Sequence, residues 1–149
     1  MHISLATLYD IPALCKLLSI LFNQEQEFSA DAERQSRGLA QIISHPETGS
    51  ILVARHQEQV IGMVNLLYTV STALGERVAI LEDMVITPEA RGMGLGSKLL
   101  SQAITHARQQ GCQRITLLTD HDNLAAQQFY ARQGFALSGM IPMRLDLRQ

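Results

Sequence analysis

A glycine-rich turn between a hydrophobic strand and an amphipathic helix constrains the fold of this chain more than any other segment. It occupies residues 85–100, where the sequence reads VITPEARGMGLGSKLL. Gly92, Gly94 and Gly96 allow the backbone to adopt φ > 0 and to approach a ligand closely. The helix predicted to begin near Leu95 directs unpaired N–H groups and the positive end of its dipole to the same place. We therefore expect an anion site here, for a phosphate or pyrophosphate group.

The spacing argues against two other glycine-rich phosphate sites. A P-loop requires G-x-x-x-x-G-K-[ST], but Gly96 is followed by Ser97, Lys98 and Leu99, which displaces the lysine and leaves no hydroxyl after it to hold magnesium. The dinucleotide fingerprint requires G-x-G-x-x-G near the start of a doubly wound sheet. Here the pattern is G-x-G-x-G and begins past the middle of the chain. Asp120, after the next predicted strand, is the feature that favours a dinucleotide.

Two motifs follow one another along the chain. The first, R-x-x-G-x-G, is filled by Arg91, Gly94 and Gly96. The second, N-x-x-A-x-x-F-Y, occupies residues 123–130 and is closed by Gly-Phe at 134–135. Together they resemble the acetyl-CoA-binding motif and the second signature of the GNAT acetyltransferase superfamily. Both motifs in this order are more specific than either motif alone.

The predicted elements follow the order β-α-α-β-β-β-α-β-α-β, which is also the layout that the GNAT resemblance implies. This is an α/β fold in which a central mixed sheet carries helices on both faces. The length suits one N-acetyltransferase domain over residues 1–149. Asp10 is the predicted N-cap of the first helix. Periodicity predicts strands at residues 2–7, 51–55, 60–68, 77–86, 114–119 and 143–147, and helices at 10–22, 31–44, 95–110 and 123–133.

Composition excludes several classes of protein. The chain is 46% hydrophobic and 17% charged with a formal net charge of −2, which argues against disorder and against a nucleic-acid surface. No apolar run approaches the roughly 20 residues of a transmembrane helix, and the N-terminus lacks the design of a signal peptide. We therefore expect a soluble cytoplasmic protein. Two cysteines and five histidines show no ligand spacing, so no metal site is predicted.

Two adjacent carboxylates, Glu82 and Asp83, interrupt a predicted strand that is otherwise apolar. The apolar residues at 77–86 predict that the strand is buried on both faces. A buried carboxylate is unfavourable unless it is paired, solvated or used in binding or catalysis. Consecutive strand residues point to opposite faces, so at most one should face the cofactor unless a bulge re-aims the strand. One interpretation is structural, with each carboxylate pairing with a nearby arginine or capping a loop.

The other interpretation is that one of these carboxylates is a catalytic base. An amine with a pKa of about 10 is almost fully protonated at neutral pH, so an N-acetyltransferase must remove a proton before or during attack. We expect Glu82 to take that proton, directly or through water, and Asp83 to orient the acceptor. GNAT enzymes that act on polyamines or aminoalkylphosphonates place a carboxylate at one of these two positions, and the resemblance leaves open which.

The GNAT resemblance also implies roles for backbone groups. At the end of the strand, the backbone of Met84, Val85 and Ile86 hydrogen-bonds the pantetheine arm of acetyl-CoA and polarises the thioester carbonyl. The backbone N–H groups that hold the pyrophosphate belong to Arg91, Gly92, Met93, Gly94, Leu95, Gly96 and Ser97. The alternatives are a plain core strand and a tight turn without a ligand.

Two side chains of the last predicted helix complete the candidate site. By resemblance, Asn123 contacts the pantetheine arm or the phosphates, and the Tyr130 hydroxyl lies near the sulfur and protonates the departing thiolate. Seven residues separate them, or two helical turns, so they share a helix face. The structural alternatives are an N-cap for Asn123 and a core aromatic residue for Tyr130.

These features predict an N-acetyltransferase that moves an acetyl group from acetyl-CoA directly to a primary amine of a small molecule. The alternative is a non-catalytic acyl-CoA-binding sensor, which would keep the loop and lose the proton-handling residues. The acidic segment at 23–33 favours a cationic acceptor such as a polyamine. An aminoalkylphosphonate would instead require a cation, with candidates at Arg34, Arg37, Arg55 and Arg77. No nucleic-acid or membrane partner is expected, and the resemblance is compatible with a homodimer.

Overall fold

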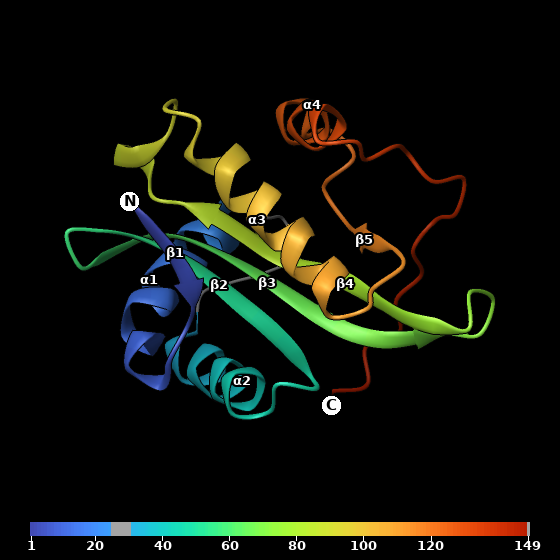
Figure 1. Cartoon of the computed structure of the whole chain (residues 1–149), viewed down its shortest axis with the longest axis horizontal. Coiled ribbons are helices and arrows are strands. Elements are labelled where there is room, and N and C mark those ends of the chain that lie inside the picture. Colours follow the sequence, from blue (N-terminus) through green and yellow to red (C-terminus); the bar gives the residue numbers. More distant parts are fainter. Residues whose placement is uncertain (25–30, 149) are drawn as a thin grey trace.

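Five strands form one mixed sheet between two layers of helices (Figure 1). The computed structural model describes residues 1–24 and 31–148. The strands are β1 (His2–Leu5), β2 (Gly49–His56), β3 (Gln59–Ser71), β4 (Glu76–Ile86) and β5 (Ile115–Leu117). The helices are α1 (Ile11–Gln24), α2 (Ala32–Ser44), α3 (Leu95–Gln109) and α4 (Leu124–Arg132), with short 3₁₀ turns η1 (Leu8–Asp10) and η2 (Pro88–Ala90).

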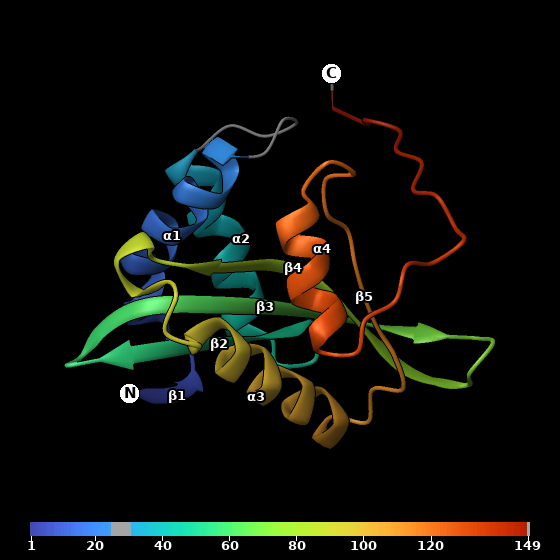
Figure 2. The same ribbon diagram turned by 90° about the horizontal axis from the view of Figure 1, so that it is seen from above.

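The strands lie in the order β1-β2-β3-β4-β5. Neighbours are antiparallel from β1 to β4, and β5 is parallel to β4. Alternation along β2 separates two cores, since Ile51 and Val53 pack toward α1 and α2, whereas Leu52 and Ala54 pack toward α3. Figure 2 shows the two layers on opposite sides of the sheet. The prediction of a mixed sheet with helices on both faces is therefore confirmed.

The glycine-rich segment folds as predicted into strand, turn and helix. Helix α3 begins at Leu95, and its apolar stripe, with Leu99, Leu100 and Ala103 fully buried, packs on the sheet. The chain leaves the helix through Gly111, whose φ of 84° lies in the left-handed region that glycine adopts without strain. The glycine-rich turn before α3 and Gly111 after it thus set where this helix begins and ends.

Asp10 has a different role from the predicted N-cap. It ends the 3₁₀ turn η1, and its Oδ2 accepts a hydrogen bond of 2.8 Å from the backbone N–H of Thr7. Both carboxylate oxygens also accept from the Arg55 guanidinium, at 2.8 and 2.6 Å. The N-cap prediction was wrong because the helical turn begins earlier, with Thr7 at the N-cap and Asp10 as the N3 residue of a capping box. The pair with Arg55 holds the pKa of Asp10 below its usual value.

Two further predictions about strands were wrong. Residues 143–147 alternate between apolar and polar types but form no strand, and among the described residues the sheet ends at β5. Alternation alone does not make a strand, because a strand also requires a neighbour for its backbone hydrogen bonds. Strand β4 is not buried on both faces, since Ile80 is 38% exposed and Glu82 is exposed. The core under α1 and α2 includes Val85 of β4 and does not extend to Ile80.

No helix in the described part of the chain is long and apolar enough to cross a membrane.

Candidate active site

A β-bulge lies at the two adjacent carboxylates. In the pairing of β3 with β4, Asn65 is opposite Asp83 and Leu66 is opposite Leu81, so Glu82 has no partner in β3. A bulge of this kind leaves one extra residue in a strand and re-aims the side chains next to it. The bulge that the sequence analysis named as the exception to strict alternation is therefore present at Glu82 and Asp83.

The two carboxylates differ in burial. Asp83 is partly buried, and its Oδ2 accepts a hydrogen bond of 3.0 Å from the Asn65 amide, Nδ2. Burial raises the pKa of Asp83 to about 6, the Asn65 hydrogen bond opposes this rise, and the negative charge of Glu82 adds to it. Glu82 is exposed to solvent. Asp83 therefore binds a proton more tightly than an ordinary aspartate, and its hydrogen-bond partner is an amide rather than an arginine.

Asn65 is a site residue that the sequence analysis missed. It is 3% exposed, and among the described residues no donor reaches its Oδ1 atom. A buried acceptor without a partner is unfavourable, which distinguishes this amide from the apolar residues around it. The signal was available, because Asn65 is the one polar side chain in the buried run at 62–66, Gly-Met-Val-Asn-Leu.

Tyr130 lies on α4 between two other aromatic rings. Its ring centroid is 5.2 Å from that of Phe129 and 5.6 Å from that of Phe135, with edge-to-face geometry in both cases. Burial, together with the negative charge of Asp83, raises the pKa of Tyr130 to about 12. The phenol therefore stays protonated at neutral pH. Although Asp83 and Tyr130 lie almost 50 residues apart in sequence, Asp83 is near enough for its charge to act on Tyr130.

Asn123 caps α4. Its Oδ1 accepts a hydrogen bond of 3.1 Å from the backbone N–H of Ala126. The N-cap alternative is therefore present in the structure. The side-chain amide nitrogen is a separate donor, so capping leaves it available to a ligand.

Gly92 and Gly94 have the backbone conformation that requires glycine. Their φ angles are 83° and 75°, and a Cβ at either position would meet no atom within 4 Å. The turn is thus open on the side where a ligand would lie. The first backbone hydrogen bond of α3 runs from the Lys98 N–H to the Gly94 carbonyl, at 3.2 Å, which leaves the preceding N–H groups of the helix directed out of its end.

Gly96 departs from the expected φ > 0, because it already lies inside α3. A Cβ there would lie 3.4 Å from two ring carbons of Phe129 and 3.8 Å from Ile86. Its small size instead permits close approach of the α4 aromatic residue to the start of α3. The prediction of positive φ was wrong at this position, and the requirement for a small residue comes from packing.

The end of β4 has one edge without a strand. Strands β4 and β5 pair only from Ala79–Ile115 to Leu81–Leu117, whereas β4 continues to Ile86. Beyond the last pair the chain leaves β5 toward α4 (Figure 1). Along Met84, Val85 and Ile86, one edge therefore faces β3 and the other faces no strand in the described structure.

Arg91 connects the loop to this strand. Its exposed side chain donates from Nε to the backbone carbonyl of Ile86, at 3.0 Å. This hydrogen bond fixes the turn relative to the end of β4. The same contact orients the other N–H groups of the guanidinium, which is positively charged.

Comparison with known proteins identifies the family. A model of the acetyltransferase (GNAT) family matches residues 8–135, which is most of the chain. The chain belongs to the GNAT acetyltransferase family. Its relatives include the uncharacterised N-acetyltransferase YhfO of Bacillus subtilis (strain 168), which is 35% identical over 77% of this chain and 78% of that protein.

Two further matches extend over nearly the whole GNAT domain. An aminoalkylphosphonate N-acetyltransferase of Salmonella typhimurium is 29% identical over 89% of this chain and 83% of that protein. A crystal structure of a probable acetyltransferase superposes with a TM-score of 0.84 at 26% identity, over 100% of this chain and 99% of the other. The fold that the GNAT resemblance implied is therefore confirmed.

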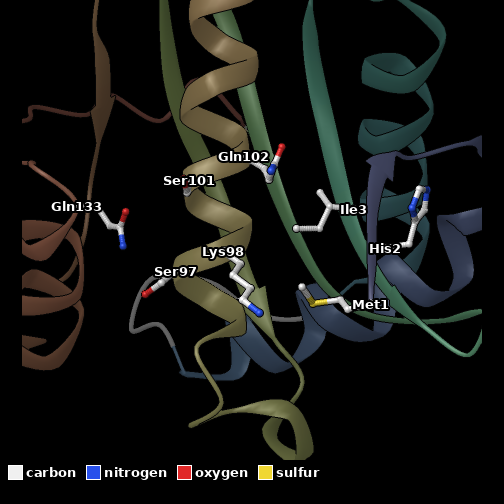
Figure 3. A pocket seen from close by; sticks show the side chains of 8 residues that line it. All are labelled: Met1, His2, Ile3, Ser97, Lys98, Ser101, Gln102 and Gln133. Atoms are coloured by element: carbon white, nitrogen blue, oxygen red, sulfur yellow. The ribbon is translucent and has the colours of Figure 1, made fainter.

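An open hollow of about 610 Å³ crosses the outer face of α3 in this GNAT domain (Figure 3). It is lined by Met1, His2, Ile3, Ser97, Lys98, Ser101, Gln102 and Gln133. Only Ser97 belongs to the predicted site, and neither Asp83 nor Tyr130 lines the hollow. The hollow is therefore separate from the predicted proton-handling residues.

The four arginines proposed as phosphonate ligands all have other partners. Arg34 pairs with Asp31 at 3.4 Å and Arg37 with Glu33 at 3.2 Å. Arg55 is held by Asp10, as described above, and the Arg77 guanidinium lies 4.9 Å from the centroid of the Tyr68 ring. The acidic segment at 23–33 falls largely outside the described residues.

Proposed function

We propose that this GNAT protein transfers the acetyl group of acetyl-CoA directly to a primary amine of a small molecule. The observation that carries the proposal is the burial of Asp83 and Tyr130 in one neighbourhood, where the charge of Asp83 acts on Tyr130. Asp83 has a pKa raised to about 6, and Tyr130 has a pKa raised to about 12. One group is suited to take a proton at neutral pH, and the other is suited to give one.

The glycine-rich turn and β4 suit acetyl-CoA, which would supply an activated acetyl thioester. Open space over Gly92 and Gly94 and the N–H groups at the start of α3 fit a pyrophosphate, held by the backbone of residues 91–97. The strandless edge of Met84, Val85 and Ile86 is assigned to the pantetheine arm. A fixed N–H there would stabilise negative charge on the carbonyl oxygen by about 3 kcal/mol.

We assign the base to Asp83 rather than to Glu82, which the sequence analysis favoured. A carboxylate with a pKa of about 6 is still largely ionised at neutral pH and is a stronger base than an ordinary aspartate. The Asn65 amide orients it. The exposed Glu82 contributes negative charge at the mouth of the site, which attracts an ammonium group.

Tyr130 is the proposed acid. Its hydroxyl stays neutral at physiological pH because the hydroxyl is buried and Asp83 is negative nearby. A neutral phenol beside the sulfur donates its proton as the thiolate departs. No covalent bond between acetyl group and enzyme is required.

The charge of the site favours diamines and polyamines as acceptors. Two adjacent carboxylates attract ammonium groups, and the unpaired Asn65 Oδ1 can accept an N–H from one of them. Because one relative is an aminoalkylphosphonate N-acetyltransferase, aminoalkylphosphonates are tested as acceptors as well. Against that class, each of the four candidate arginines already has a partner.

Thiol release from acetyl-CoA, measured across diamines, polyamines, aminoalkylphosphonates and amino acids, tests this proposal. Calorimetric binding of CoA is measured alongside. We expect turnover with at least one amine class and binding of CoA. Tight CoA binding without turnover would favour the acyl-CoA sensor, and an absence of CoA binding would overturn the assignment of the loop.

A further inference from the structure

Gln35, near the start of α2, is a buried amide without a partner. The residue is 8% exposed, and within residues 1–24 and 31–148 no hydrogen bond reaches its Nε2 or its Oε1 atom. The Asn65 Oδ1 atom is in the same condition. Native proteins bury few such atoms, because each one lacks a hydrogen bond that water would supply. Both amides therefore suit a ligand that provides the missing hydrogen bonds.

Gln35 faces the layer between α2 and the sheet. It precedes Leu39 by four residues, so both side chains lie on one face of the helix. Leu39 is 2% exposed and packs in one core cluster with Met63 of β3 and Val85 of β4. Residues 31–34 are exposed, and Gln35 is the first buried residue of α2. Its amide therefore lies where the exposed end of the helix meets this core.

Asp83 and Asn65 face the same layer. On β3, Asn65 follows Met63 by two residues, and on β4, Asp83 precedes Val85 by two. The register of the two strands is regular over this stretch, and its shift begins only beyond Asn65. Alternation therefore puts Asn65 on the face of Met63 and Asp83 on the face of Val85. One core layer thus holds the proposed base and both of the incompletely bonded amides.

We propose that Gln35 determines which amines the protein accepts, by binding a hydroxyl group that the acceptor carries in addition to its amine. This inference rests on the proposed acetyl transfer at Asp83. The Gln35 amide offers both a donor, Nε2, and an acceptor, Oε1. A second ammonium group can only donate, so it would leave Nε2 without a partner. A hydroxyl group both donates and accepts, and it is small enough for a closely packed core.

The two ends of the acceptor then bind by different chemistry. The reacting amine is attracted by the carboxylates of Glu82 and Asp83, whereas the hydroxyl group makes neutral hydrogen bonds with Gln35. A plain alkylamine of the same length would bring a methyl group to Gln35 and leave both amide atoms without partners. A site that hydrogen-bonds a hydroxyl group discriminates strongly against the analogue that lacks it.

Matched pairs of amines test this selection. Each pair is an amino alcohol with two to six carbons and the alkylamine in which a methyl group replaces the hydroxyl. Affinity is measured by NMR titration of the full chain, alone and saturated with CoA, so the readout does not require turnover. At the best length the native chain should bind the amino alcohol about fivefold or more tightly than its alkylamine. In Gln35→Met this preference should disappear.

Equal affinities in the native chain at every length, or a preference that survives Gln35→Met, would overturn the proposal. Gln41→Met is the matched control, because Gln41 is exposed on the same helix. It should leave the preference unchanged. Loss of the preference in this variant as well would overturn the assignment to Gln35.

The melting temperature of the free protein gives a second readout. Methionine has nearly the length and volume of glutamine and no amide to bury, so Gln35→Met should raise Tm by about 2 °C or more. Gln35→Leu, a second apolar replacement, should also raise it. Lower Tm values in both variants would show that the amide has a structural role in the free chain, which would overturn the proposal.

Turnover measured alongside separates the role of Gln35 from the proposed function. A native chain that prefers amino alcohols in the titration but transfers no acetyl group would support the role of Gln35 and contradict acetyl transfer. Turnover with equal kcat/KM for both amines of every pair would support acetyl transfer and overturn the role of Gln35.

Discussion

The Asn65 amide donates a hydrogen bond of 3.0 Å to the Asp83 carboxylate, across the β-bulge that separates Asp83 from Leu81 in the pairing with β3. The bond holds the carboxylate in place while burial makes it a stronger base. Among the described residues, the other polar atom of the amide, Asn65 Oδ1, has no hydrogen-bond partner, and we propose that it accepts from the amine. One amide thus positions both the base and, in our account, the amine.

Replacing each carboxylate separately should identify the base. Asp83→Asn removes the proton acceptor, so kcat/KM for the amine should fall about 100-fold or more. Glu82→Gln has the same change in charge on an exposed neighbour and should lower kcat/KM less than about 10-fold, mainly through KM. Steady-state kinetics with the best amine of the panel measures both variants. Equal losses, or a larger loss for Glu82→Gln, would return the base to Glu82.

Asp83→Asn should also stabilise the protein at alkaline pH. The pKa of Asp83 in the folded chain, about 6, lies above its usual 3.8, so burial favours the neutral acid. Its contribution to stability is fully present below the unfolded pKa and is lost as pH rises through 6. The neutral asparagine should therefore raise the free energy of unfolding by about 2 kcal/mol near pH 8, and by much less near pH 4.

Urea denaturation of both proteins at the two pH values measures this difference. A variant that is less stable than the native chain near pH 8 would show that burial does not destabilise the ionised carboxylate.

Tyr130→Phe should separate chemistry from binding. The ring keeps its edge-to-face contacts with Phe129 and Phe135, and only the hydroxyl is removed. We expect kcat to fall more than about 10-fold while acetyl-CoA affinity changes little. Tyr9→Phe, at a residue that is 95% exposed, controls for loss of any hydroxyl. An unchanged kcat would remove Tyr130 as the acid.

Gly94→Ala should weaken CoA binding through the backbone. Gly94 has a φ of 75°, which alanine adopts at a cost of about 1 kcal/mol, so the turn should shift and the CoA dissociation constant should rise roughly fivefold or more. Gly38→Ala is the control. It lies inside α2 with no atom within 4 Å of the added Cβ, and should stabilise the protein by up to about 1 kcal/mol. Calorimetry of CoA binding that shows equal affinity for Gly94→Ala and the native chain would contradict a role for the turn.

The parts of the fold set by local sequence were predictable. Glycine positions and apolar periodicity placed α3 and its end at Gly111, and the hairpin of β2 and β3. Competing long-range contacts decided the rest. Asp10 pairs with Arg55, and no sequence pattern links two residues 45 positions apart.

The site shows the same division. The motifs indicated the loop and Tyr130, but the bulge that distinguishes Glu82 from Asp83 depends on the register with β3, which sequence alone does not contain. Asn65 carried a signal, a lone amide in an apolar run, although its function required the partner strand. The alternation at 143–147 was detectable, but a strand also requires a neighbouring strand, which local sequence does not reveal.

The most direct test of the central claim is the pH dependence of kcat/KM for amine acetylation, measured for the native chain and for Asp83→Asn. A base must be ionised to act, so the native rate should rise with pH through an apparent pKa near 6 and then level off, because Tyr130, with a pKa of about 12, stays protonated. In Asp83→Asn the limb near pH 6 should disappear from the residual rate. A limb that persists unchanged in Asp83→Asn and vanishes in Glu82→Gln would contradict the account.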